Sequence, residues 1–330
     1  MGLIVALDAG GTRTDCLIGK TDGEILAKLA AGPANYHLVG IDGVTSTIRR
    51  LLREADKCLI HEKPTFELMW MGIAGLDRPG EREQLAAPIR DMQVAKRVVI
   101  DNDGVVALAS GTMGGPGIVV IAGTGSLAFG VNEEGKRARS GGWGYILGDE
   151  GSAYYIGHKA LNAVTQAKDG RNKPTVLSQA IISHFKINSV DDLVGLAYGG
   201  RLGRIEIANL SPIVAEAADK GDEVASEILD LAGTELGIAA CAVAKALNME
   251  DTRFPSVTTG GVFKSGRRVT DALMRELMKA APGAILTQPQ FPPVAGAYFL
   301  ALQELGVSVN EDVVERVRRS LARLEPSVGV

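Results

Sequence analysis

The chain has 330 residues, of which 46% are hydrophobic and 5% aromatic, and it carries a formal net charge of -4. This length accommodates two domains of ordinary size, and the composition is typical of a globular α/β protein. The weak negative charge and the dispersed basic residues argue against a nucleic-acid partner.

The cysteines and the N-terminal segment indicate the cellular compartment in which we expect the protein. Cys16, Cys58 and Cys241 lie far apart and form no Cys-x-x-Cys pair, so we expect neither a disulfide framework nor a zinc or iron–sulfur site. The N-terminus lacks a basic region, and no apolar run approaches the ~20 residues that span a bilayer. We therefore expect a cytoplasmic protein with no membrane partner.

A glycine-rich turn between two apolar stretches occurs twice. The first copy is Leu-Asp-Ala-Gly-Gly-Thr-Arg-Thr at 7–14, and the second is Ile-Ala-Gly-Thr-Gly-Ser at 121–126. Each follows a short apolar strand, and each leads through a second stretch to a turn, at 21–23 and 132–135. Glycine lets backbone N–H groups approach phosphate oxygens, which a Cβ would obstruct. One copy alone is as readily a plain hairpin, but two copies predict a nucleotide cleft.

Asp8 refines this interpretation. A carboxylate beside a phosphate would repel it unless a cation such as Mg²⁺ lay between them, so Asp8 predicts a metal–nucleotide complex. The chain contains no Gly-x-x-x-x-Gly-Lys-Ser/Thr motif, and no Gly-x-Gly-x-x-Gly follows its first strand. A P-loop NTPase and a dinucleotide-binding fold are therefore disfavoured.

The first half continues with alternating helices and strands that deliver two carboxylates. We expect an amphipathic helix at 44–59, a strand at 68–73, a helix at 82–91 and a buried strand at 97–100. Asp101 and Asp103 follow that last strand, where open α/β sheets carry their ligand chemistry. Asp103 could instead cap a helix that begins near Val105.

The second half begins after a glycine-rich segment at 110–117, which we expect to connect the two domains. The expected elements are a helix capped by Ser152 and ending at about 164, mostly helical chain to about 247, a strand at 257–263 that breaks at Gly260 and Gly261, and helices at 269–281, 294–305 and 312–323. These elements suggest an N-terminal domain at 1–115 and a C-terminal domain at 116–309. The C-terminal helix, about 310–330, is able to pack on the first domain.

Taken together, these motifs resemble the sugar kinase, Hsp70 and actin superfamily. Within it, Gly-Gly-Trp-Gly at 141–144, followed by Gly-Asp-Glu-Gly-Ser-Ala-Tyr at 148–154, is similar to the N-acetylglucosamine kinase group of the BadF/BadG/BcrA/BcrD-type ATPase family. The resemblance covers the chain from Ile4 to about Leu305. It implies an α/β fold of two ribonuclease H-like domains, a duplicated actin-like ATPase fold with an interdomain cleft for ATP and a sugar.

The resemblance also implies a role for individual residues. ATP is expected to contact Gly10, Gly11, Thr12, Thr124, Gly125, Ala208, Gly260 and Gly261, with Asp8 supporting Mg²⁺ through water. The sugar is expected to contact Asn35, Asp103, Ser126, Gly142, Trp143, Gly144 and Asp149. Asp103 is the expected catalytic residue, because a sugar hydroxyl needs a carboxylate about 2.6–3.2 Å away to orient it and accept its proton. Asp101 is its rival.

Several of these residues also have a simpler, purely structural interpretation. Asp149 and Glu150 could be acids in the first turn of a helix that complement its dipole. Trp143 could be a packing residue, and Asn35 could be an ordinary polar residue of a loop. Leu127 and Ala74 replace polar groups that the family pattern suggests for N-acetylglucosamine, which leaves glucosamine, glucose or a broader range of hexoses open.

The sequence thus predicts an ATP-dependent carbohydrate kinase. The alternative is a non-kinase ATPase of the same superfamily, such as an activator of acyl-CoA reductases or dehydratases. Such activators need a cysteine at the domain junction, and none lies near 110–117 or 141–151. A sugar-sensing regulator would add a DNA-binding segment, which is not expected before Asp8. A homodimer is one option for the assembly.

Overall fold

The computed structural model describes residues 2–58, 65–76 and 80–324, which form two compact units. Unit 1 takes Met1–Gly115 together with Pro289–Val330, and unit 2 takes Pro116–Gln288. The last residue of the helix expected at 44–59 lies outside the described residues. Among the helices of the described ranges, none combines the length and the apolar character that crossing a membrane requires.

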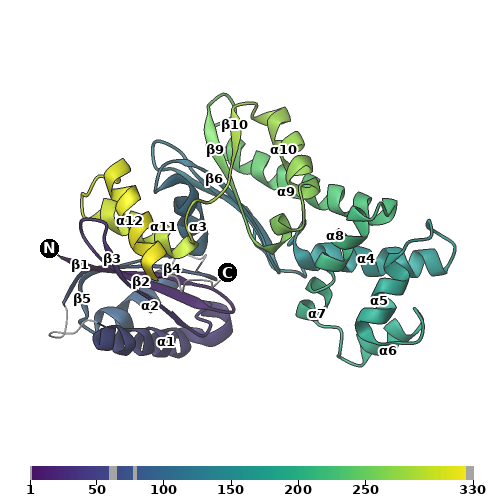
Figure 1. Ribbon diagram of the computed structural model, residues 1–330, viewed down its shortest axis with the longest axis horizontal. Coiled ribbons are helices and arrows are strands. Elements are labelled where there is room, and N and C mark those ends of the chain that lie inside the picture. Colours follow the sequence, from purple (N-terminus) through teal and green to yellow (C-terminus); the bar gives the residue numbers. More distant parts are fainter. Residues whose placement is uncertain (1, 59–64, 77–79, 325–330) are drawn as a thin grey trace. The chain divides into compact units, whose positions relative to one another are not determined.

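Unit 1 is built on a mixed five-stranded sheet in the order β3-β2-β1-β4-β5 (Figure 1). The strands are β1 Leu3–Ala9, β2 Thr14–Lys20, β3 Ile25–Ala31, β4 Phe66–Ile73 and β5 Ala95–Asn102. β1 lies at the centre, antiparallel to β2 and parallel to β4, and β5 is parallel to β4. The carboxyl ends of β1, β4 and β5 therefore meet at one edge of the sheet.

Helices cover both faces of this sheet. They are α1 Tyr36–Cys58, α2 Glu81–Arg90, α3 Asp103–Thr112, α11 Pro293–Glu304 and α12 Glu311–Leu324. Ile48 of α1 and Leu85 of α2 pack with Val5 and Leu7 of β1 on one face. Since side chains alternate along a strand, Ile4 and Ala6 point to the other face, where α3 and α11 lie. The sheet is thus a central layer, and its buried β1 is apolar on both sides.

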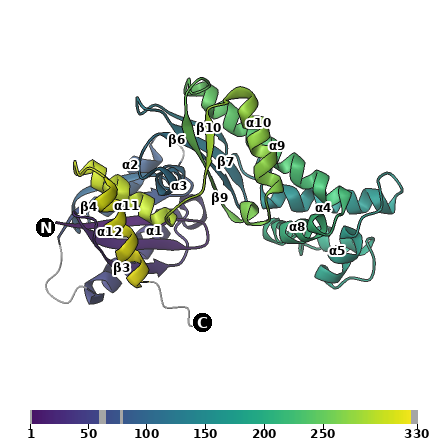
Figure 2. The same cartoon turned by 45° about the horizontal axis from the view of Figure 1, so that its top comes forward.

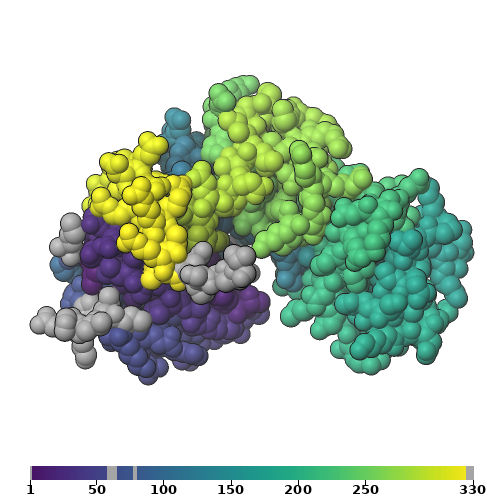
Figure 3. Space-filling view, viewed as in Figure 1, coloured from purple at the N-terminus to yellow at the C-terminus, as the bar shows by residue number. Residues whose placement is uncertain are grey.

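The two C-terminal helices both belong to unit 1. The helix expected at 294–305 falls within the predicted domain 116–309, yet the structure packs α11 against α3 and β1. The apolar α11 is almost wholly buried there, which explains why it leaves the unit that precedes it in sequence. α12 lies on β3, where the Ser320 hydroxyl accepts the Ile25 N–H at 3.0 Å. In Figure 3 these C-terminal residues (yellow) cover the N-terminal ones (purple).

Unit 2 repeats the strand order of unit 1 in its own sheet, β10-β9-β6-β7-β8. The strands are β6 Gly117–Ala122, β7 Ser126–Val131, β8 Arg137–Gly141, β9 Phe254–Thr259 and β10 Ala284–Thr287. The helices are α4 Ala153–Lys168, α5 Leu177–Phe185, α6 Asp192–Tyr198, α7 Arg204–Ala208, α8 Ser211–Asp219, α9 Glu223–Ala246 and α10 Arg268–Ala280, with a 3₁₀ turn η1 at Gly261–Lys264. Figure 2 shows α9 and α10 side by side against this sheet.

Both sheets place a central strand, β1 or β6, before a glycine turn and an antiparallel partner. This confirms the predicted duplicated α/β fold. Three strands escaped prediction, and all three, β3, β8 and β10, are edge strands. β5 was expected to be a buried strand, which is wrong: it is also an edge strand, and Lys96 and Arg97 within it are exposed. An edge strand pairs on one side only, so it needs no continuous apolar run.

A substitution at Gly296 tests how closely α11 must approach α3. A Cβ at this position would overlap the Val106 carbonyl of α3, so Gly296→Ala forces the two helices apart. We expect a loss of about 1–3 kcal/mol in the stability of unit 1, seen as a lower melting temperature in calorimetry.

Gly195→Ala is the matched control, because Gly195 also lies in a helix but has open space where the Cβ would stand. It should be neutral or stabilise the protein by up to about 1 kcal/mol. Equal melting temperatures for the wild type and Gly296→Ala would contradict the close helix packing.

Candidate active site

The parallel strands of unit 1 bring acidic residues to one edge of the sheet. Asp8 in β1 is aligned with Gly72 in β4, and Gly72 is aligned with Asp101 in β5. Aligned residues of a sheet point to the same face, so both carboxylates start on the face covered by α3. A Cβ at Gly72 would overlap the Val106 side chain of α3. Glycine at this position therefore lets α3 begin directly against the strand ends.

Asp8 interacts electrostatically with Asp103, the first residue of α3. Burial, together with the neighbouring charges of Asp103 and Asp15, raises the pKa of Asp8 from 3.8 to about 7, and burial is the largest of these causes. The structure thus brings together the two acids that the sequence assigned to metal support and to catalysis. Because like charges disfavour ionisation, this site favours either a proton or a cation.

The N-cap of α3 is Asn102, whose side-chain oxygen accepts the Gly104 N–H at 2.7 Å. The alternative that Asp103 caps this helix is therefore wrong, since the helix begins at Asp103 itself. Asp101, the rival base, is 5% exposed and forms an ion pair with Arg82 at 3.0 Å. Its carboxylate also accepts the Asn102 N–H at 2.8 Å. Arg82 carries no sequence signal, because α2 and β5 meet only in the folded unit.

The first glycine turn is held by backbone hydrogen bonds from neighbouring loops. The Gly10 N–H donates to the Arg13 carbonyl at 2.9 Å, and the Gly10 carbonyl accepts the Ala34 N–H at 3.1 Å. Gly11 and Thr12 are exposed at its tip. Neither Gly10 nor Gly11 has positive φ, so glycine here leaves the surface of the turn bare rather than permitting an unusual backbone angle.

Asn35 lies between this turn and the end of β4. Its side-chain oxygen accepts the N–H groups of His37 at 3.0 Å and Leu38 at 3.2 Å, so Asn35 caps α1. The next residue, Tyr36, donates its N–H to the Ala74 carbonyl at 3.0 Å. Capping explains why α1 begins eight residues before the helix expected from position 44, although the helix is interrupted at Gly40, just after its first turn. A contact between Asn35 and a sugar stays a prediction.

The second glycine turn, in unit 2, is supported from below. The Gly123 N–H donates to the Gly125 carbonyl at 2.9 Å, and the Gly123 carbonyl accepts the Ala153 N–H at 2.8 Å. The Ser126 hydroxyl donates to the Glu150 carbonyl at 2.7 Å. Thr124 is exposed at the tip. This turn is therefore tied to the start of α4, whose predicted N-cap, Ser152, is confirmed.

Asp149 is buried under that turn in a left-handed conformation, with φ of 63° and 3% exposure. Its carboxylate accepts the Ser126 N–H at 3.3 Å and pairs with Arg204 at 3.0 Å. Burial raises the pKa of Asp149, while the Ser126 hydrogen bond and Arg204 oppose the rise. The alternative of first-turn acids is wrong for Asp149 and for Glu150, because α4 begins only at Ala153. Sequence reasoning missed Arg204, which lies 55 positions further along.

Ser126 and Trp143 line the same small cavity of about 200 Å³ in unit 2. Leu127, Leu147, Glu150 and Glu235 are also in its wall. Trp143 is 67% exposed, which argues against a packing role, and the Arg139 guanidinium lies over its ring, 5.5 Å from the ring centre. Gly142 and Gly144 flank it with φ of 72° and 83°, a left-handed backbone that favours glycine on both sides of the tryptophan.

The late glycine pair follows β9, the strand beside β6. A Cβ at Gly260 would overlap the backbone of Ala122, so only glycine brings this chain against the end of β6. Gly261 begins η1 and is exposed. Ala208 is the last residue of α7 and is buried. Their expected contacts with adenosine stay predictions.

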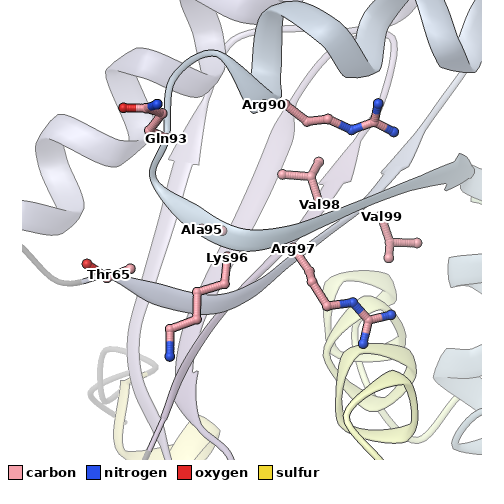
Figure 4. A pocket seen from close by; sticks show the side chains of 8 residues that line it. All are labelled: Thr65, Arg90, Gln93, Ala95, Lys96, Arg97, Val98 and Val99. Carbon is pink, nitrogen blue, oxygen red and sulfur yellow. The ribbon is translucent and has the colours of Figure 1, made fainter.

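A larger hollow of about 640 Å³ lies along β5 and is not part of this site (Figure 4). Arg90, Lys96 and Arg97 line it. Each pairs with an acid, since Arg90 contacts Glu83 at 3.0 Å, Lys96 contacts Glu67 at 2.7 Å and Arg97 contacts Glu304. None of the predicted site residues borders this hollow.

Two sheets of identical strand order, each with a glycine turn after its central strand, define a two-domain actin-like protein. Carboxylates beside a glycine turn are groups that could hold Mg²⁺ next to phosphate oxygens. Residues 5–301 match the BadF/BadG/BcrA/BcrD ATPase family, and the chain belongs to that family.

Named relatives cover nearly the whole chain. It is 33% identical to the N-acetylmuramic acid/N-acetylglucosamine kinase of Clostridium acetobutylicum, over 92% of this chain and 99% of that protein. It is 32% identical to the N-acetyl-D-glucosamine kinase of Dictyostelium discoideum, over 91% and 98%. A crystal structure from Chromobacterium violaceum, named as a candidate N-acetylglucosamine kinase, matches with a TM-score of 0.70 and 27% identity, covering 92% of this chain and 99% of that one.

The raised pKa of Asp8 predicts a pH-dependent stability. Because its folded pKa of about 7 exceeds the unfolded value of 3.8, the folded state holds the proton more tightly between these values. Stability is therefore lost as pH rises through this window. Asp8→Asn removes the titration, so its melting temperature, measured without metal or nucleotide, should exceed that of the wild type by a margin that grows from about pH 4 to pH 7.

Asp42→Asn, which alters an exposed carboxylate of α1, is the control and should show no such trend. A margin for Asp8→Asn that is the same at pH 5 and pH 8 would contradict the buried, proton-binding state of Asp8.

Proposed function

We propose that the chain is an ATP-dependent sugar kinase that transfers the γ-phosphate of ATP to a hydroxyl of a hexose or amino sugar. The observation that carries this proposal is the convergence of Asp8 and Asp103 beside the first glycine turn. Membership of an ATPase family supports the use of ATP. Curated relatives that are sugar kinases support the acceptor class.

Asp103 takes the role of general base in this proposal. A sugar hydroxyl is a poor nucleophile at neutral pH, so a carboxylate must orient it and accept its proton. Asp103 is the better candidate than Asp101, because Asp103 interacts with Asp8 at the strand that leads into the first glycine turn, whereas Asp101 is buried against Arg82 of α2. Phosphoryl transfer then depends mainly on positioning and on charge neutralisation.

Mg²⁺ fits the acids of unit 1 through water rather than through direct ligands. The described residues contain no group of three or more His, Cys, Asp or Glu side chains arranged to hold a metal alone. Asp8, however, lies among interacting carboxylates whose repulsion a cation would relieve. Mg²⁺ bound with ATP would neutralise phosphate charge, and Asp8 would hold its water shell.

The remaining assignments follow the sequence prediction. Phosphates would contact Gly10, Gly11, Thr12, Thr124 and Gly125, and adenosine would contact Gly260, Gly261 and Ala208. The sugar would contact Asn35, Ser126, Gly142, Trp143, Gly144 and Asp149. N-acetylglucosamine is the first substrate to test, while Leu127 and Ala74 keep glucosamine and glucose as candidates. A cytoplasmic location and a homodimer stay predictions.

The decisive experiment is a sugar panel with ATP and Mg²⁺, followed by ADP release. We expect turnover that depends on a hexose or amino sugar. Asp103→Asn should lower kcat by about 100-fold to 10,000-fold while nucleotide binding is retained, because only the proton acceptor is lost.

Asp101→Asn is the matched control, two positions away and also a carboxylate at this edge. It breaks the pair with Arg82, so it should lower the melting temperature but leave kcat within a few-fold. Sugar-independent ATP hydrolysis that Asp103→Asn leaves unchanged would instead favour the non-kinase ATPase.

A further inference from the structure

An arginine lies directly beneath the second glycine turn. If Gly125 carried a Cβ, that atom would stand 2.8 Å from Arg204 Nη2 and 2.7 Å from Asp149 Oδ2. The backbone of the turn therefore rests on the Arg204–Asp149 ion pair, and glycine is what permits the approach. Nothing in the order of residues indicates this, because Arg204 begins α7, far from the turn in sequence.

The orientation of this guanidinium is set from two sides. Nη2 of Arg204 donates to Asp149 Oδ2 at 3.0 Å, and the Arg204 Cζ lies 5.4 Å from the centre of the Tyr145 ring. Asp149 is itself fixed by burial and by the Ser126 N–H. An arginine held by a carboxylate and an aromatic ring is preorganised, so binding a further anion costs little side-chain entropy.

The guanidinium keeps donors for a ligand. Its side chain is 39% exposed, and the Asp149 carboxylate that it contacts is 4% exposed. A guanidinium has five N–H donors, of which the ion pair with Asp149 uses one. The planar fork of arginine matches the oxygens of a phosphate group.

We propose that Arg204 is a phosphate-contacting residue of the nucleotide site and that Asp149 positions it. This rests on the proposed function, in which Thr124 and Gly125 bind the phosphates of ATP. The turn supplies a surface without side chains, and Arg204 supplies a positive charge immediately below it. Asp149 then acts on the nucleotide through Arg204 and the turn.

A purely structural ion pair would behave differently. If Arg204 only supported the turn, its loss would act by leaving the Asp149 carboxylate without its partner beneath Gly125, and adding Asp149→Asn would restore the affinity for ADP and ATP. If Arg204 contacts phosphate, its loss weakens ADP and ATP, spares adenosine, and is not restored by Asp149→Asn. The double variant therefore separates the two roles, and adenosine shows whether the rest of the nucleotide site is intact.

The test is calorimetric binding of adenosine, ADP and ATP with Mg²⁺ and without sugar, to the full chain and to Arg204→Gln. We expect ADP or ATP to bind about 10-fold to 100-fold more weakly to the variant, as the loss of charged hydrogen bonds predicts, and adenosine affinity to stay within about twofold. Arg204→Lys, which keeps the charge but not the fork, should lie between the two.

Arg268→Gln is the matched control. Arg268 pairs with Asp230 at 3.1 Å, and its side chain is 45% exposed, but α9 and α10 carry this pair, and no residue assigned to the nucleotide belongs to either helix. It should leave all three affinities unchanged. Equal losses for adenosine and ATP in Arg204→Gln, or no loss for either, would overturn the proposal.

Asp149→Asn tests the positioning step separately. If Asp149 acts through Arg204, its loss weakens ATP, and the double variant is less impaired than the two single effects combined. Unchanged ATP affinity in Asp149→Asn would overturn this step. These measurements need no phosphorylated product, so a chain that binds ATP as expected but phosphorylates no sugar would contradict the proposed function and leave Arg204 supported.

Discussion

The approach of α3 to the carboxyl ends of β1 and β4 is the constraint on which unit 1 depends. Gly72 leaves room for the Val106 side chain, and Gly296 lets α11 approach the backbone of the same helix. This packing brings Asp103 close enough to Asp8 for the two charges to interact. The core thus holds together two acids that repel each other, and their repulsion makes the site receptive to a cation.

The two units share one strand order and hold their glycine turns with backbone hydrogen bonds, but unit 2 adds an ion pair. In unit 1 the turn is tied by backbone hydrogen bonds, through Gly10 to Ala34. In unit 2 an ion pair between the buried Asp149 and the exposed Arg204 also lies beneath the turn. Burial of the Asp149 carboxylate is offset by this pair and by the hydrogen bond from the Ser126 N–H. The two units therefore share a fold, but different residues support their glycine turns.

Much of the architecture could be predicted because central elements carry strong local signals. The hairpins around both glycine turns, the Ser152 cap and the long helix α9 are of this kind. Three edge strands, β3, β8 and β10, were missed; β8 is mostly polar and β10 has only four residues, so neither carries a strong strand signal. The first turn of α1 was missed because an asparagine cap, Asn35, stands before a segment interrupted by Gly40.

The sequence by itself determined the repeated glycine turns, the acids at strand ends and the family to which they belong, because these are local patterns of residue type and spacing. Only the tertiary structure decided which acids interact, that Asn102 caps α3, and that Arg82 and Arg204 pair with Asp101 and Asp149. It also decided that α11 belongs with the N-terminal strands. The physical reason is that burial and charge act through distance in space, and residues separated by tens of positions come within a few ångströms only when helices pack on sheets.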